Sequence, residues 1–185
     1  MIAPFAHMAP ATLMELALAV PVAGAFLVLA TGRNANLRDA VSLMTAVVLF
    51  LVVCSLYPQV ASGSRPDLMF MEMVPGLSLR LTLEPLGMIF ALVASFLWII
   101  TTMYAIGYMR GHHEENQTRF YFFFAISIAA VMGVALAGNM LTLFVFYEVL
   151  SVSTYPLVAH HGTEEAKRGG RVYLGILLTP RSPSC

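Results

Sequence analysis

"LFVFYEVLSVSTYPLVAHH", residues Leu143 to His161, is an apolar stretch with one carboxylate, that of Glu148, close to its centre. A helix that spans a bilayer needs about 20 mostly apolar residues, and this stretch has that length. At about 1.5 Å per residue, Glu148 lies roughly 14 Å along the helix from Asn139 and roughly 18 Å from His160. This depth is near the bilayer midplane, where a charged side chain costs several kcal/mol. We therefore interpret Glu148 as a residue that faces protein or water and handles protons or cations.

Polar side chains continue from Glu148 along one face of the expected helix. Residues three and seven positions later lie on the same helical face as the glutamate, and both are polar here. Pro156 has no backbone N–H, so it leaves the carbonyl of Val152 without its usual helical partner on that face. The stripe leads toward two histidines at the end of the span. The candidate ion path therefore consists of Glu148, Ser151, Tyr155, His160 and His161. The alternative for the two histidines is that they only lie in the headgroup region.

The composition is that of an integral membrane protein. Of the 185 residues, 59% are hydrophobic and only 11% are charged, and the mean hydropathy is +0.81. Soluble domains carry about 25% charged residues. The formal net charge is zero, which gives no indication of nucleic-acid binding. Cys54 and Cys185 form no disulfide or metal-binding pattern, and there is no glycine-rich phosphate loop, so we expect no cofactor and no metal.

Five segments are long and apolar enough to cross a membrane, and each must be helical because hydrocarbon cannot satisfy backbone polar groups. The predicted fold is an all-α polytopic membrane protein that forms a single transmembrane domain over residues 1–178. The predicted spans are 11–31, 40–61, 87–109, 120–138 and 139–160.

The connection between the second and third spans, residues 62–86, has a different pattern. Apolar and polar residues alternate in "LMFMEMV" and again in "LSLRLTLE", with Pro75 and Gly76 between them. Alternation on both sides of a turn signal is typical of a β-hairpin. The alternative is an irregular loop. We interpret Glu84, at the end of this connection, and Glu15, near the start of the first span, as residues at the membrane interface.

The distribution of basic residues predicts the orientation in the membrane. Seven of them fall on one side and two, Arg65 and Arg80, on the other. Because cytoplasmic loops are enriched in Lys and Arg, the first side is expected in the cytoplasm and the N-terminus outside, in a bacterial cytoplasmic (inner) membrane. The seven residues are Arg33, Arg38, Arg110, Arg119, Lys167, Arg168 and Arg171, and the last five of them are interpreted mainly as orientation signals.

The C-terminal segment begins like a sixth span and stops early. Residues 172–178 are apolar, but they would rise only about 10 Å as a helix, a third of the hydrocarbon thickness. Residues 179–185 form a polar tail with two prolines. We expect a truncated, frameshifted or partial product, with a naturally short re-entrant segment as the alternative.

Three motifs carry a family resemblance. "LTLEPLGMIFAL" at residues 81–92, "YAIGYMRG" at 104–111, and "FYEVLSVSTYPLVAHH" followed by "EEAKRGGRVYL" at 146–174 resemble the antiporter-like subunits shared by Mrp-type cation/proton antiporters and respiratory complex I. The residues of these motifs are most similar to those of the D-type subunits of the Mrp antiporters. The resemblance covers about residues 80–178.

The resemblance implies a protein of about fourteen spans built on two inverted repeats, in which Glu148 is the key acidic residue of the ion path and works with a lysine on a later span. It implies no redox cofactor. It also implies that the partners are other membrane subunits, lipid, protons and monovalent cations. The chain departs from this pattern, because its single lysine, Lys167, falls in a connection and no second repeat is present.

Three functions follow as hypotheses. The first is an N-terminal portion of a proton- or cation-translocating antiporter subunit. The second is a membrane subunit of a NADH:quinone oxidoreductase or a membrane-bound hydrogenase complex, without a catalytic site of its own. The third belongs to another class, a non-transporting assembly element or a non-functional truncated product.

Overall fold

The computed structural model describes residue 5 and residues 8–74, 77–111 and 116–158, which contain five helices and two strands. All five helices are long and apolar enough to cross a membrane, which confirms the predicted all-α membrane fold. The predicted partial span at 172–178 and the polar tail at 179–185 lie outside the described residues. The helices are α1 (Pro10–Ala30), α2 (Ala35–Ala61), α3 (Pro85–Gly111), α4 (Gln117–Ala135) and α5 (Met140–Val158).

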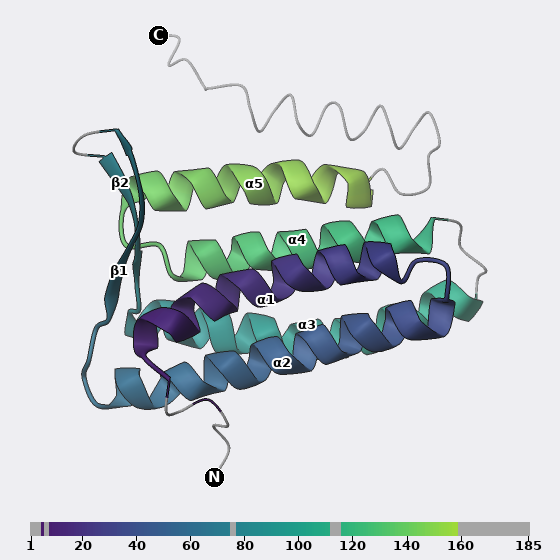
Figure 1. The fold of residues 1–185 in the computed structure, drawn as a ribbon, viewed down its shortest axis with the longest axis horizontal. Coiled ribbons are helices and arrows are strands. Elements are labelled where there is room, and N and C mark those ends of the chain that lie inside the picture. The colour runs from purple at the N-terminus through teal and green to yellow at the C-terminus, as the bar shows by residue number, and fades with distance from the viewer. Residues whose placement is uncertain (1–4, 6–7, 75–76, 112–115, 159–185) are drawn as a thin grey trace, which may run out of the picture.

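The helices run up and down, and the first four enclose a common interior. α1 packs against α2 and α4, and α3 packs against the same two helices, so α1 to α4 form a closed ring. α5 lies outside this ring, against α4 (Figure 1). The β-strands lie across one end of the helices, which we call the hairpin end. The other end, where α1 meets α2 and where α3 ends and α4 begins, we call the arginine end.

The packing of the ring follows from small and medium-sized side chains turned inward. Its core includes Leu13, Met14, Leu49 and Met132, none of which is exposed. Many large apolar side chains face outward instead, as they do where the surroundings are lipid and not water. Examples on three helices are Phe26, Leu27, Met44, Met103 and Tyr104.

The hairpin predicted in the 62–86 connection is present. β1 (Asp67–Val74) and β2 (Leu77–Thr82) pair in an antiparallel manner, with two irregularities in the register. The turn residues 75 and 76 lie outside the described residues. β2 also binds the connection between α4 and α5, because the Thr82 N–H donates to the Leu136 carbonyl and the Gly138 N–H donates to the Arg80 carbonyl, both at 2.8 Å.

This pairing explains why α4 ends before the predicted boundary. The apolar pattern runs to Gly138, but residues 136–138 leave the helix and lie beside β2. Asn139 then caps α5, because its side-chain oxygen accepts a hydrogen bond from the Thr142 N–H at 2.8 Å, as N-cap residues do. Its amide nitrogen donates to the Ser78 carbonyl at 2.7 Å. A single residue therefore starts α5 and attaches it to the hairpin.

α2 begins earlier than its hydropathy indicates, at Ala35 and not at Ala40. The charged residues Arg38 and Asp39 fall within its first turns, and both are buried. Charged residues mark the end of an apolar segment in the sequence, so they set the predicted boundary of the span. They can nevertheless belong to the helix when they neutralise each other. Arg38, predicted to lie in an exposed connection, is thus part of the helix.

The contact between α4 and α5 depends on a glycine. A methyl group at Gly133 would overlap the ring of Phe146, which packs directly on the α4 backbone at this point. At Gly107, in α3, an added methyl group would meet nothing within 4 Å.

We predict that Gly133→Ala destabilises the protein by about 1–3 kcal/mol, the usual cost of overpacking. Gly107→Ala, a substitution of the same chemistry, serves as the control and is expected to cause no loss. The measurement is denaturant unfolding of the purified chain in detergent, followed by circular dichroism. Equal effects of the two substitutions would contradict the packing described here.

Candidate functional site

The face of α5 that carries Glu148 points away from α4. Ser153 of α5 bonds Ser127 of α4 through their hydroxyls, which are 3.0 Å apart and both buried, so Ser153 marks the face turned to α4. Glu148 precedes Ser153 by five residues, which turns it about 140° around the helix axis. Ser151 and Tyr155 lie on the same side as Glu148. In the described part of the chain, α5 packs mainly against α4 and β2. The predicted ion-path face is therefore turned away from the described helices.

Glu148 is partly buried and forms no hydrogen bond or ion pair with any described residue. The Ser151 hydroxyl is buried and donates to the Tyr147 carbonyl at 2.9 Å, and Tyr155 is partly buried. Pro156 lies within α5, which continues past it to Val158. The two histidines of the predicted path, His160 and His161, lie outside the described residues. The structure thus brings Glu148, Ser151 and Tyr155 to one helical face, and their role in an ion path stays a prediction.

The other acidic candidates lie apart from this face. Glu15 on α1 and Glu84 before α3 are both exposed. The His112–Glu115 segment lies outside the described residues. Within the part of the chain that the structure describes, no three His, Cys, Asp or Glu side chains come together as metal ligands would.

A second polar cluster, at the arginine end, was not expected from the sequence. Its centre is Asp39 of α2, whose carboxylate binds two arginines. One oxygen accepts from Arg38 Nε at 3.0 Å and Nη2 at 2.9 Å, and the other accepts from Arg110 Nε at 2.8 Å. The side chains of Arg38 and Asp39 are only 6% and 5% exposed, whereas that of Arg110 is 46% exposed. A buried carboxylate with two charged donors makes the strong, charge-assisted type of hydrogen bond.

The cluster joins three helices. Arg110 ends α3 and also donates to Asn36 of α2 at 2.9 Å. Arg38 donates to the side-chain oxygen of Gln117 in α4 at 2.7 Å, and its guanidinium lies 5.2 Å from the centre of the Tyr121 ring. That distance permits a cation–π interaction. Arg38 and Arg110 therefore link helices, a role that the sequence did not predict, and their role as orientation signals stays a prediction.

The sequence did contain a signal for this cluster. Asp39 is an acidic residue at the start of a span, directly after an arginine, and the end of the third span supplies a second arginine at the same end of the bundle. In an up-and-down bundle these two ends meet. The pairing could not be assigned without knowing that α2 and α3 are neighbours.

The chain is similar, over most of its length, to proteins named as probable or putative antiporter subunits. It is 32% identical over 173 residues to a probable K(+)/H(+) antiporter A/B subunit of Rhizobium meliloti (strain 1021), and the match covers 90% of this chain and 17% of that protein. It is 27% identical over 156 residues to the "Putative antiporter subunit mnhA2" of Staphylococcus aureus (strain JH9), with 80% of this chain and 19% of that protein covered. The chain therefore spans less than a fifth of the length of these relatives.

Two further comparisons concern respiratory complexes. The family described as "NADH-Ubiquinone oxidoreductase (complex I), chain 5 N-terminus" matches residues 69–121. A chain in the structure of the membrane-bound sulfane sulfur reductase, an archaeal respiratory membrane complex, superposes with a TM-score of 0.75 and 21% identity, over 88% of this chain and 33% of that one. At this identity the superposition shows a shared fold.

We predict that Asp39→Asn destabilises the protein by about 3–5 kcal/mol, because it leaves two guanidinium groups, one of them buried, without their counter-charge. Asp67→Asn is the matched control, since Asp67 pairs with Arg80 at 3.7 Å and both side chains are about half exposed. The control should cost less than about 1 kcal/mol. The measurement is denaturant unfolding in detergent, and comparable losses in the two variants would contradict the role of the cluster.

Proposed function

Because this chain belongs to the family of antiporter-like membrane subunits shared by Mrp-type antiporters and complex I, we propose that it takes part in proton-coupled transport of monovalent cations. In this proposal the chain supplies an N-terminal portion of such a protein. Glu148 is the group that takes up and releases a proton. The names of the relatives indicate antiport. Antiport by this chain is part of the proposal, since the chain spans less than a fifth of the length of those relatives.

The observation that carries the proposal is the position of Glu148. A carboxylate in the middle of a span is costly and is usually functional, with its partner on a neighbouring element. Glu148 has no partner among the described residues, and its face of α5 is turned away from the helix ring. In the proposal, the partner of Glu148 is a further element on that face, such as the lysine-bearing span that the family resemblance implies.

The remaining residues of the proposed path follow from the same helix. Ser151 and Tyr155 continue the face of Glu148 toward the arginine end. His160 and His161 would exchange protons with the aqueous side. We propose that this side is the cytoplasm, which agrees with the placement of Arg33, Arg38, Arg110 and Arg119 at one end of the bundle and with the positive-inside rule. The N-terminus would then lie outside, in a bacterial inner membrane.

The assignment to one branch of the family stays a prediction. The motif residues are most similar to those of the D-type subunits. The Rhizobium and Staphylococcus relatives, however, carry the names of A/B-type and A-type subunits. A second candidate function is that of a membrane component of a respiratory complex of the NADH:quinone oxidoreductase type. The match of residues 69–121 to the complex I family favours it. In both cases Glu148 would serve proton movement.

We predict that Glu148→Gln, introduced into the chromosomal gene so that the chain assembles with its natural partners, reduces cation-dependent proton exchange in membrane vesicles to background. Glutamine keeps the size and polarity of the side chain and cannot take up and release the proton. Glu84→Gln is the control, because Glu84 is exposed at the hairpin end. The measurement is the collapse of a pH gradient on addition of sodium or potassium.

The result also separates the candidates. Full exchange in Glu148→Gln vesicles would overturn the role of Glu148. Wild-type vesicles that show no cation-dependent exchange, but do show proton uptake driven by a respiratory substrate, would favour the second candidate. Copurification with other membrane subunits and no proton movement of either kind would leave an assembly element as the function.

A further inference from the structure

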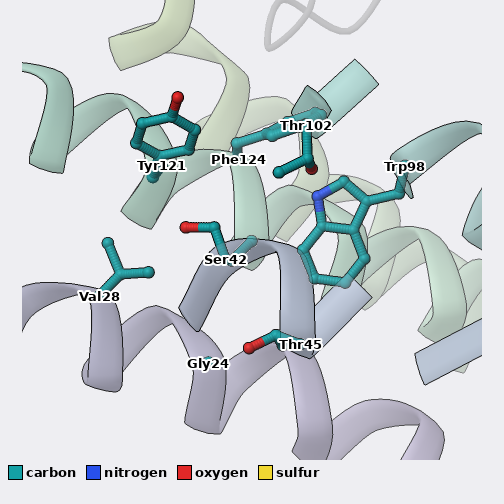
Figure 2. A pocket seen from close by; sticks show the side chains of 9 residues that line it. Gly24, Val28, Ser42, Thr45, Trp98, Thr102, Tyr121 and Phe124 are labelled. Carbon is teal, nitrogen blue, oxygen red and sulfur yellow. The ribbon is translucent and has the colours of Figure 1, made fainter. Parts of the chain in front are cut away.

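A small cavity lies inside the ring of α1 to α4, on the opposite side of α4 from α5. All four helices of the ring contribute to its wall (Figure 2). The space open to the centre of a water molecule has a volume of about 10 Å³. A buried site needs roughly 10–15 Å³ by this measure to hold one water. The cavity is thus the size of a single water molecule.

One wall of this cavity presents a hydroxyl group without a partner. Thr102 of α3 is 1% exposed, and its Oγ1 forms no hydrogen bond with any described residue. Trp98, one turn earlier on α3, lines the same cavity and is 3% exposed. Figure 2 shows the Thr102 hydroxyl and the Trp98 indole nitrogen on the α3 side of the cavity. A buried hydroxyl that is left unpaired is costly, so an unseen partner is indicated.

The opposite wall offers acceptors. The Ser42 hydroxyl of α2 donates to the Arg38 carbonyl at 3.0 Å, and the Thr45 hydroxyl donates to the Val41 carbonyl at 2.7 Å. Their protons are therefore in use, but each oxygen keeps lone pairs that can accept. Thr102 on α3 and Ser42 and Thr45 on α2 thus line the same space, which is the size of one water.

The same chemistry argues against a cation as the occupant. A dehydrated cation requires several oxygen ligands, usually including carboxylates or carbonyls. The described wall of this cavity contains no carboxylate, and the Trp98 N–H would repel a positive ion. A water molecule can accept from the Thr102 hydroxyl and donate to the Ser42 and Thr45 oxygens. We propose that this cavity is a binding site for one ordered water molecule that joins α3 to α2.

The proposed water would extend the polar cluster at the arginine end into the bundle. Ser42 is one of its partners, and the Ser42 hydroxyl is already bonded to the backbone of Arg38. Arg38 in turn binds Asp39. Hydrogen bonds would then connect the Arg110–Asp39 pair to Thr102 through both the side chain and the backbone carbonyl of Arg38. This series lies inside the helix ring and is separate from the face of α5 that carries Glu148.

The test uses two adjacent threonines of α3. Thr101 is exposed and donates to the Leu97 carbonyl at 2.9 Å, whereas Thr102 faces the cavity. Valine replaces threonine with nearly the same shape and no hydroxyl. If water bridges Thr102 to α2, Thr102→Val loses that bridge, and we expect its melting temperature in detergent to fall about 2–4 °C below that of Thr101→Val. If the Thr102 hydroxyl has no partner, its removal raises the melting temperature instead.

Trp98 gives a local readout, because it is the only tryptophan in the chain. Loss of a polar neighbour makes the surroundings of the indole less polar, so Thr102→Val should shift its fluorescence to shorter wavelength and Thr101→Val should not. A melting temperature of Thr102→Val equal to or above that of Thr101→Val overturns the proposal.

If Thr102→Val does not fold, a second measurement decides whether a water molecule occupies the cavity. A wild-type structure at a resolution that shows other buried waters should contain a density peak within hydrogen-bonding distance of Thr102 Oγ1 and of Ser42 or Thr45. An empty cavity in such a structure overturns the proposal regardless of the variants.

Discussion

The absence of water from hydrocarbon is the constraint on which the structure of this chain depends. Each polar group in a span must find its partner within the protein. Most hydroxyls meet this requirement in the simplest way, by donating to a carbonyl of their own helix, as Ser42, Thr45, Ser95 and Ser151 do. Charged groups meet it by pairing, as in the Asp39 cluster. The groups that remain unpaired among the described residues are few, and they mark where a water or another partner is to be expected.

The helices could be predicted from the sequence because their signal is local. Apolar runs of about 20 residues identify spans, and alternation around Pro75 and Gly76 identified the hairpin. The ends of the helices were harder, since they depend on contacts with other segments. α4 ends early because β2 binds the chain that follows it, and α2 begins early because Asp39 neutralises Arg38. The pairing with β2 cannot be read from the residues where α4 ends, and the burial of Arg38 and Asp39 depends on Gln117 and Arg110, which are distant in the sequence.

In the candidate site, too, local features could be predicted from the sequence and contacts between distant segments could not. The sequence predicted that Glu148, Ser151 and Tyr155 share a face, since helical periodicity settles this. It could not predict which neighbour that face meets, because helices that are apolar all round give no sign of their inner side. The Ser127–Ser153 hydrogen bond supplies that information by turning the opposite face of α5 to α4. The importance of Asp39 was missed for a related reason, since its two arginines come from different parts of the chain.

The three attachments of α5 have a mechanical consequence. Asn139 fixes its first turn to the hairpin, Phe146 rests on Gly133, and Ser153 bonds Ser127. These points span roughly 21 Å of helix, and Glu148 lies between the last two. A rod held at three places along its length can neither tilt nor rotate freely. α5 is therefore held in place relative to α4 and the hairpin, and in the proposed transport cycle these three elements would move together. In that proposal, the changes that alternately expose and shield the carboxylate would come from an element on the other side of α5.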